Sequence, residues 1–260
     1  MEKVEWMDII TENIKNSNMF IKRIFDIIAS LLGLLILWPV LLVVAIMIKV
    51  KMPGGPAFFT QKRVGKGGKL FTCHKFRTMT MAPKASEALN GSKGSNWSTV
   101  SVAGDSRITP FGAKLRHYKL DELPGLWDVL IGNMSFVGPR PDVPGYADKL
   151  VGDDRDVLKL RPGITGPATL KYRLEDEMIA EFVRKLREGS IELREGLRMP
   201  ENINTMTDQE VAVWYNDNVI YPDKVRLNCY YYRHYSFWKD IEMILATVLK
   251  FKVKFAGEYV

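Results

Sequence analysis

The stretch IIASLLGLLILWPVLLVVAIMI, residues 27–48, decides the fold class because it is apolar at nearly every position. Only Ser30, Gly33 and Pro39 interrupt it. As one straight helix it would be roughly 33 Å long, enough to cross the hydrocarbon core of a bilayer. Core helices of soluble proteins rarely stay apolar on every face for so long, so the stretch predicts a membrane helix.

The charges on either side of this stretch argue against an ordinary membrane span. Lys22 and Arg23 precede it, and Lys49 and Lys51 follow it closely. Basic residues next to a membrane helix favour the cytoplasmic side, so both ends of this helix are drawn to the same side. The late start and the lack of a small-x-small site after the stretch argue against a cleaved signal peptide.

The dipeptide Trp38-Pro39 lies just past the midpoint of the apolar stretch. A proline inside a helix removes one hydrogen bond and clashes with the preceding turn, so we expect the helix to bend there. A bent helix with two basic ends can enter one leaflet and return. The sequence therefore favours a re-entrant membrane helix over residues 21–51.

The remaining sequence divides around this helix. Residues 1–20 mix charges with apolar side chains and predict an amphipathic N-terminal segment. Residues 52–260 are expected to form a cytoplasmic catalytic domain. Within it, the basic amphipathic helix expected at residues 237–255 could lie in the membrane plane or pack against a core.

The pattern of the catalytic part predicts an α+β fold that is mostly helical. Two short aromatic strands around a glycine-rich turn should form a small β-hairpin, and three helices should follow a polar loop. The expected elements are strands at 58–64 and 70–77, a loop at 82–104, helices starting at Thr109-Pro110 and after Pro124, and an amphipathic helix at 175–189. With the re-entrant helix and interfacial helices, the whole is predicted to be a monotopic membrane protein.

The basic excess is concentrated in one part of the chain. The 260 residues carry 37 Lys and Arg against 30 Asp and Glu, a net charge of +7. Residues 51–150 hold 15 basic and 7 acidic side chains, a net of +8. An anionic partner is expected there: nucleic acid, an acidic membrane or phosphate groups in a site. The distant Cys73 and Cys229 argue against a disulfide framework or a zinc module.

Asp121 and Glu122 are the candidate catalytic residues because they stand just ahead of Pro124, which is favoured in a first helical turn. A helix N-terminus stabilises an ionised carboxylate, so Asp121 could act as a nucleophile or a base. Adjacent carboxylates also suit Mg²⁺, which binds substrate phosphates as well. Helix capping explains the same pair equally well.

Five basic residues are candidates for binding phosphate, since guanidinium groups match phosphate oxygens in two-point contacts. They are Lys75, Arg77, Arg116, Arg140 and Arg161. The scattered His74, His117 and His234 are interpreted as surface or packing residues. The glycine-rich turn at 65–69 lacks the order of a Walker motif, which excludes nucleotide binding of that type.

The order of motifs along the chain also resembles that of a known protein family. The motifs are FFTQKRVG, HKFRTM, DSRITPFGAKLR, LDELPGLWDVLIGNMSFVGPRP, LRPGITGPATLKYR and YYYRHYSFWKDI. From about residue 20 to residue 250 the chain closely resembles the bacterial sugar transferases, the monotopic polyprenyl-phosphate phosphoglycosyl transferases.

The resemblance implies an enzyme of the cytoplasmic face of the bacterial inner membrane. Such enzymes move a sugar-1-phosphate from a UDP-sugar to undecaprenyl phosphate, release UMP and start a capsule, O-antigen or glycoprotein glycan. The resemblance makes Asp121 the nucleophile that forms a phosphosugar-enzyme and Glu122 the residue that holds Mg²⁺. It makes the five basic residues contacts for phosphate or nucleotide, with Arg161 the weakest candidate, and anionic lipids neighbours of the site.

The chain departs from the family pattern at three places. Trp38-Pro39 stands where many members have Ser-Pro, Asn228 where many have aspartate, and Thr165-Gly166-Pro167-Ala168-Thr169 where Thr-Gly-Trp-Ala-Gln is common. Residues 172–225 are longer than in the smallest members. These departures leave the sugar and the glycan pathway open.

The sequence argues against two other functional hypotheses. A membrane-anchored module that binds anionic lipid or nucleic acid would not need an acid pair inside its basic block, so nucleic acid is not expected as a partner. A CDP-alcohol phosphatidyltransferase would need aspartates on several membrane helices, and one membrane segment is visible. The sequence leaves the oligomeric state open, a homodimer included.

Overall fold

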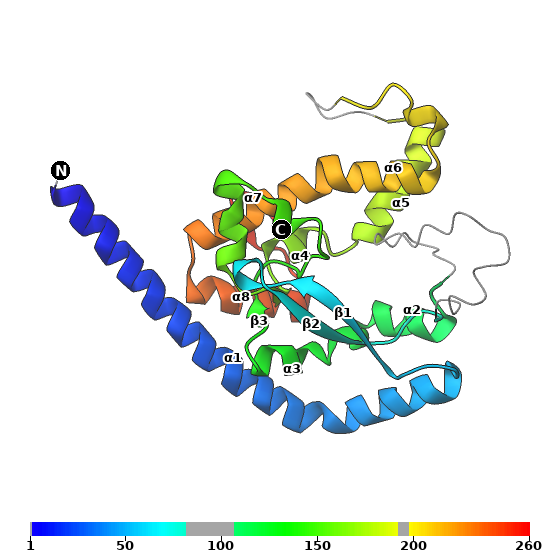
Figure 1. Ribbon diagram of the computed structural model, residues 1–260, viewed down its shortest axis with the longest axis horizontal. Coiled ribbons are helices and arrows are strands. Elements are labelled where there is room, and N and C mark those ends of the chain that lie inside the picture. The colour runs from blue at the N-terminus through cyan, green and yellow to red at the C-terminus, as the bar shows by residue number, and fades with distance from the viewer. Residues whose placement is uncertain (1, 82–106, 192–197) are drawn as a thin grey trace.

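The computed structural model describes residues 2–81, 107–191 and 198–260, with the side chains of residues 2–16 left out. The chain folds into a mostly helical α+β structure with three two-stranded sheets among the described residues. Figure 1 shows one long helix, α1, running below the remaining elements, which gather on its concave side. The loop expected at 82–104 lies outside the described residues.

Helix α1 (Glu2–Lys51) is continuous, so the N-terminal segment and the membrane helix form one element. Pro39 lies inside this helix without interrupting it, and Figure 1 shows the helix changing direction in its second half. Its portion Ser17–Lys51 is long and apolar enough to cross a membrane, and only 11% of the most apolar window is buried. That low burial separates α1 from the core helix of a soluble protein.

Both ends of the apolar stretch of α1 contact the rest of the chain. Near the start, Lys22 and Asp26 are buried, and the Asp26 carboxylate accepts a hydrogen bond from the backbone N–H of Phe136. Near the end, Ile48 is buried against Phe76 and Leu115. Most side chains between these contacts are exposed, among them Leu35, Ile36, Trp38, Leu42, Val43 and Ile46.

The predicted hairpin and helices are confirmed, with one helix shorter than expected. Strands β1 (Phe58–Val64) and β2 (Leu70–Phe76) pair antiparallel. Helices α2 (Pro110–His117), α3 (Gly125–Leu130) and α5 (Glu175–Arg187) follow. Helix α8 (Phe237–Leu249) ends before residue 255 because Lys250 takes a left-handed conformation, with φ at 60°, and the chain turns into a small hairpin of β5 (Lys254–Phe255) and β6 (Glu258–Tyr259).

The remaining elements build the core behind the hairpin. Strands β3 (Ser135–Val137) and β4 (Gly163–Thr165) pair in parallel. Helices α4 (Pro167–Lys171), α7 (Tyr221–Arg233) and α8 pack around that pair through buried side chains such as Val137, Leu227 and Met243. Helices α5 and α6 (Asp208–Tyr215) bury a separate small cluster that includes Ile179 and Val211.

Candidate active site

Asp121 and Glu122 lie in a single 3₁₀ turn, Leu120–Glu122, between α2 and α3. Lys119 precedes this turn in a left-handed conformation, with φ at 55°, so the chain reverses direction between α2 and α3. Asp121 is 8% exposed, and its Oδ1 atom has no hydrogen-bond partner among the described residues. One carboxylate oxygen of this residue is therefore buried without a partner in the described part of the chain.

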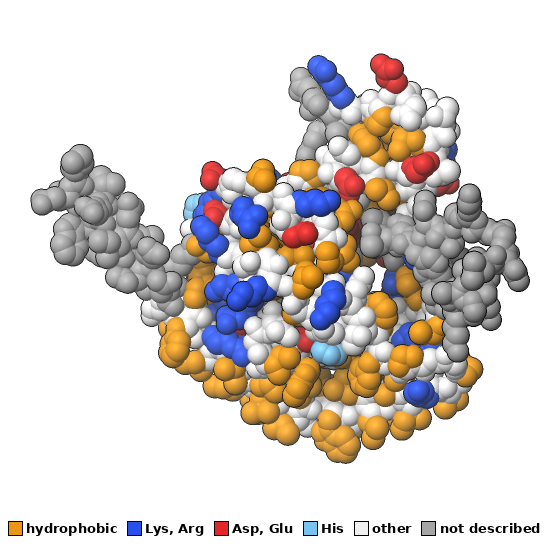
Figure 2. All heavy atoms as spheres, viewed as in Figure 1, with side chains coloured by type: hydrophobic (Ala, Val, Ile, Leu, Met, Phe, Trp, Pro, Cys, Tyr) orange, Lys and Arg blue, Asp and Glu red, His pale blue; other side chains and the backbone are white. Residues whose placement is uncertain are grey.

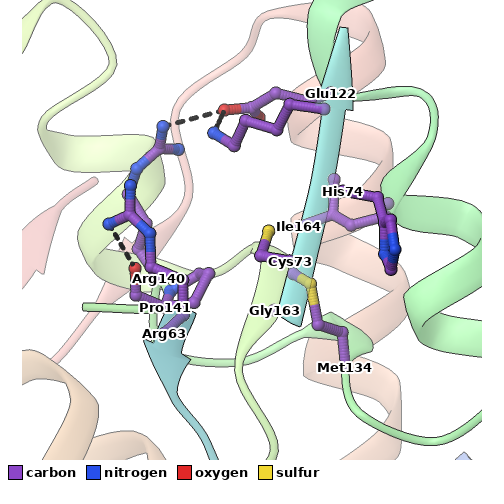
Figure 3. Close-up of a pocket in the computed structure, with 11 residues that line it drawn as sticks. Arg63, Cys73, His74, Glu122, Met134, Arg140, Pro141, Gly163 and Ile164 are labelled. Atoms are coloured by element: carbon purple, nitrogen blue, oxygen red, sulfur yellow. Dashed lines mark hydrogen bonds and ion pairs between the residues drawn. The ribbon is translucent and has the colours of Figure 1, made fainter. Parts of the chain in front are cut away.

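Glu122 is held between two cations. Lys75 Nζ lies 2.9 Å and Arg140 Nη2 lies 2.8 Å from the same Oε1 atom of Glu122, as the dashed lines in Figure 3 show. Burial alone would raise the pKa of Glu122, but the charges of Arg140 and Lys75 outweigh it and hold that pKa well below its usual range. Glu122 is therefore ionised throughout the physiological pH range.

Asp121 shows the opposite shift, which corrects one expectation from the sequence. Burial raises the pKa of Asp121, and the negative charge of Glu122 raises it further, while Lys75, Arg116 and Lys119 oppose the rise. The expected stabilisation of the ionised form by a helix N-terminus does not prevail, because the carboxyl lies in a dehydrated turn beside another carboxylate.

Close backbone packing places Arg140. Gly138, at the end of β3, lies so near Gly163 of β4 that a Cβ on Gly163 would be 2.2 Å from the Gly138 nitrogen. The segment that follows, Pro139–Pro141, therefore runs along the hairpin, and the Arg140 side chain reaches Glu122. Two sequence motifs that are distant in the chain thus build one wall of the site.

A pocket opens beside Glu122 (Figure 3). One part of its wall is charged and formed by Arg63, Lys75, Glu122 and Arg140; another is apolar and formed by Cys73, Met134 and Ile164. A wall of this mixed kind can accept a phosphate group on one side and an uncharged ring on the other.

Arg63 is a candidate binding residue that the sequence patterns did not single out. It lines the pocket, and Figure 3 shows it on the same side as Arg140. Its guanidinium donates to the carbonyl of Pro141 at 3.1 Å and to Gln61 Oε1 at 2.7 Å. The hairpin register could have revealed it, because Arg63 pairs with Phe71, and alternation along β2 puts Phe71, Cys73 and Lys75 on one face of the hairpin.

The other predicted phosphate contacts lie at three different places. Arg116 donates to Thr78 Oγ1 at 3.1 Å, and its charge acts on Asp121. Arg77 is buried and donates to the carbonyl of Met52, just after α1. Arg161 donates to the carbonyl of Gly132, beyond the far end of α3. The structure thus brings Lys75 and Arg140 to the pocket, keeps Arg116 close to Asp121, and leaves Arg77 and Arg161 outside.

His74 connects the hairpin to α3. Its backbone N–H and its Nδ1 atom contact the two carboxylate oxygens of Asp128 at 2.9 and 2.8 Å, and Asp128 is fully buried. This agrees with the interpretation of His74 as a packing residue. The contact fixes β2, and with it Lys75, relative to the helix that follows Glu122.

A divalent cation at this acid pair would have few protein ligands, because Glu122 Oε1 already binds Lys75 and Arg140. Among residues 2–81, 107–191 and 198–260, no group of three or more His, Cys, Asp or Glu side chains could hold a metal by itself. Mg²⁺ commonly takes one or two carboxylates and completes its shell with water and substrate phosphates. Asp121, with its unpartnered Oδ1, and Glu122 provide such a partial set.

Comparison with known proteins places the chain in a family. The family described as "Bacterial sugar transferase" matches residues 17–254. Over 157 residues the chain is 41% identical to the undecaprenyl-phosphate galactose phosphotransferase of Salmonella typhimurium, covering 58% of this chain and 33% of that protein. Over 129 residues it is 43% identical to a putative undecaprenyl-phosphate N-acetylgalactosaminyl 1-phosphate transferase of Bacillus subtilis, covering 50% and 66%.

The name of a third relative specifies a different sugar, glucose. The chain is 37% identical over 148 residues to the UDP-glucose:undecaprenyl-phosphate glucose-1-phosphate transferase of Xanthomonas campestris pv. campestris, covering 56% of this chain and 28% of that protein. The chain spans between about a quarter and two thirds of the length of these three relatives. Because the family match covers nearly the whole chain, including Asp121, Glu122 and the pocket, the chain belongs to the bacterial sugar transferase family.

Proposed function

We propose that this protein transfers a sugar-1-phosphate from a UDP-sugar to undecaprenyl phosphate, releases UMP and so initiates the assembly of a bacterial glycan. The observation that carries the proposal is the buried Asp121, with one unpartnered carboxylate oxygen, next in sequence to Glu122, which lines a pocket with Lys75, Arg63 and Arg140. The names of the relatives support the carrier and the class of donor. They differ in the sugar, so the donor sugar of this chain is for a substrate screen to decide.

The reaction proposed has two displacement steps at phosphorus. In the first, an Asp121 carboxylate oxygen attacks the β-phosphorus of the UDP-sugar, and the bond to the bridging oxygen breaks, so that UMP leaves with the electron pair. In the second, a phosphate oxygen of the lipid carrier attacks the same phosphorus, and the Asp121 carboxylate leaves. No net proton transfer is required, and the products are the sugar-diphospholipid and the free enzyme.

The basic residues of the pocket would bind and orient the diphosphate. Arg140 and Lys75 already neutralise Glu122. Arg63 adds a third positive charge to the pocket, and it forms no ion pair with a carboxylate of the described residues. Asp121 and Glu122 would hold Mg²⁺, which when bound neutralises charge on the phosphate oxygens. The apolar wall at Met134 and Ile164 leaves room for an uncharged part of the donor.

The membrane arrangement proposed is re-entrant, at the cytoplasmic face of the inner membrane, with both ends of the apolar stretch on that side. Lys22 near its start and Ile48 near its end are both buried against the same catalytic domain. A straight span would carry these two positions to opposite sides of the bilayer. The exposed apolar side chains of α1 between them would lie in one leaflet, beside Trp127 on α3.

The covalent route is tested by trapping the intermediate. The protein is incubated with each of a set of UDP-sugars without a lipid acceptor, and intact mass is measured together with UMP release. We expect a mass increase of one phosphosugar for the accepted donor, lost in Asp121→Asn together with at least a 10³-fold decrease in turnover, which is about 4 kcal/mol of transition-state stabilisation.

Two further arms of this experiment separate the parts of the proposal. Asp148→Asn, an acidic residue outside the pocket, is the matched control and should retain both adduct and turnover. Chelation by EDTA should stop UMP release, and added Mg²⁺ should restore it. Normal turnover by Asp121→Asn would refute the covalent route.

A further inference from the structure

Two arginines lie at the C-terminal end of α3, at the opposite end of that helix from Glu122. Arg23 on α1 donates Nη1 to the carbonyl of Val129 at 2.7 Å and Nη2 to the carbonyl of Leu130 at 2.9 Å. Arg161 donates Nε to the carbonyl of Gly132 at 3.0 Å. Helix C-terminal carbonyls stabilise positive charge, so both guanidinium groups are fixed in place.

Lys66 completes this group of cations. It lies in the turn between β1 and β2, which packs against the segment Gly152–Lys159 just ahead of Arg161. Arg23 and Arg161 meet at Gly132, because Arg161 donates to the Gly132 carbonyl and Arg23 Nη2 lies 3.1 Å from the position that a Cβ on Gly132 would take. The charge of Arg161 also acts on Lys66. We call Arg23, Lys66 and Arg161 the basic cluster.

The basic cluster lacks an ion-pair partner within the described residues. None of its three members forms an ion pair with a residue of the described ranges, whereas Lys75, Arg140, Lys171 and Arg226 all do. The charge of Asp26, which accepts the N–H of Phe136, acts on Arg23 and offsets only part of this positive charge. Three like charges held together repel one another, and an anion from outside the chain would relieve that repulsion.

The basic cluster lies at the border of the apolar surface. Arg23 stands just ahead of the apolar stretch of α1, and two exposed side chains lie beside it: Trp127 on α3 and Ile131 directly after that helix. Figure 2 shows Lys and Arg side chains gathered directly above the hydrophobic lower edge of the molecule, between the β1–β2 turn and α3 of Figure 1. In a bilayer this border is the level of the lipid phosphates.

We infer that the basic cluster binds the phosphate of an anionic phospholipid headgroup and so fixes the depth and tilt of the domain at the membrane. The inference rests on the proposed membrane arrangement, but not on the proposed reaction. It also gives Arg161 a different partner from the nucleotide phosphate that the resemblance implied. The exposed Lys66 and the terminal nitrogens of Arg161, for which the described residues supply no partner, would make the contacts.

The test measures lipid binding directly. The full-length protein in neutral detergent is titrated with phosphatidylglycerol or phosphatidylcholine, and bound lipid is counted by native mass spectrometry. We expect Lys66→Gln/Arg161→Gln to bind phosphatidylglycerol about tenfold more weakly, with phosphatidylcholine binding unchanged. Arg184→Gln/Lys185→Gln on α5, which removes the same charge from exposed ion pairs, is the matched control and should bind like the parent protein.

Each outcome decides the inference. Unchanged phosphatidylglycerol binding in the cluster variant, or an equal loss in the control, overturns it. If the variant keeps phosphatidylglycerol but its KM for undecaprenyl phosphate rises, the cluster serves the carrier phosphate and the inference is also overturned. Lys66→Gln alone, at an exposed turn, repeats the test if the double variant is unstable. The titration needs no turnover, so an absence of UMP release would count against the proposed reaction and leave this result intact.

Discussion

At the scale of single residues, the charge on Lys75 connects the two acids of the site. Lys75 binds Glu122 and also lowers the pKa of Asp121, which burial has raised. In the proposed reaction Asp121 must be deprotonated to attack, so the acid limb of kcat/KM should lie above the ordinary aspartate pKa of about 3.9. Lys75→Met removes a charge that favours the ionised form, so this limb should move to higher pH.

The measurement is a pH profile of UMP release for the parent protein and for Lys75→Met. Lys185→Met, whose side chain pairs with Glu181 on the surface of α5, is the control and should leave the limb in place. The position of the limb is the readout, because Lys75→Met is also expected to bind substrate less well. A limb that stays where it is in Lys75→Met would contradict the assigned role of Asp121.

Arg63 offers a second prediction at this scale, on donor binding. Its guanidinium is oriented by Pro141 and Gln61 and lines the same wall as Arg140. Arg63→Lys keeps the charge but loses the planar two-point contact with phosphate. We expect KM for the UDP-sugar to rise about tenfold, roughly 1.4 kcal/mol, with a smaller change in KM for the lipid carrier. Arg155→Lys, outside the pocket, should change neither; a rise confined to the carrier would reject the role.

At the scale of elements, a buried ion pair holds α1 against α8. Lys22 Nζ lies 2.5 Å from Asp240 Oδ2, and Tyr231 and Tyr235 donate hydrogen bonds to the same carboxylate. Removing one partner leaves a buried charge without compensation, so Asp240→Asn should destabilise the protein by about 3–5 kcal/mol. Glu242→Gln, two residues along α8 in an exposed pair, should cost no more than about 1 kcal/mol.

Thermal unfolding in a fixed detergent measures both variants. Lys22→Met/Asp240→Asn should unfold at a higher temperature than Asp240→Asn alone, because the double variant buries no unpaired charge. If Asp240→Asn and Glu242→Gln unfold at the same temperature, this pair does not connect the two helices.

Local signals explain which elements could be predicted from the sequence. Thr109 accepts the N–H of Gly112, which is the capping contact that its position ahead of Pro110 predicts. The glycine-rich turn and alternating aromatic residues likewise predict β1 and β2. The pairing of β3 with β4 has no local signal, because it joins segments about 28 residues apart through the close approach of Gly138 and Gly163.

The site shows the same difference between local and distant interactions. Asp121, Glu122, Lys75 and Arg140 could be predicted because each belongs to a distinctive motif. Arg63 could be placed only through the hairpin register, and the depth of burial that raises the pKa of Asp121 depends on the whole domain. Arg161 shows the converse: its motif is prominent, yet packing directs its Nε to Gly132.

At the scale of the whole molecule, α1 and the turn that carries Asp121 and Glu122 are parts of one assembly. Arg23 on α1 binds the last carbonyls of α3, and α3 begins three residues after Glu122. At its other end, α1 packs through Ile48 on Phe76, at the end of the strand that carries Lys75. The active site is thus fixed to α1 on both sides of the apolar stretch.

This double attachment makes the membrane topology testable with three cysteines. In a background where Cys73 and Cys229 are replaced, Ser17→Cys and Pro56→Cys place a thiol at exposed positions before and after the apolar stretch, and Ser190→Cys marks the catalytic domain. A membrane-impermeant maleimide is applied to whole cells and to inverted membrane vesicles. Because both ends of the stretch contact one domain, all three thiols should be protected in cells and labelled in vesicles. Labelling of Ser17→Cys alone in whole cells would mean that α1 spans the membrane, and the contacts of Lys22 and Asp26 with the domain could then not form.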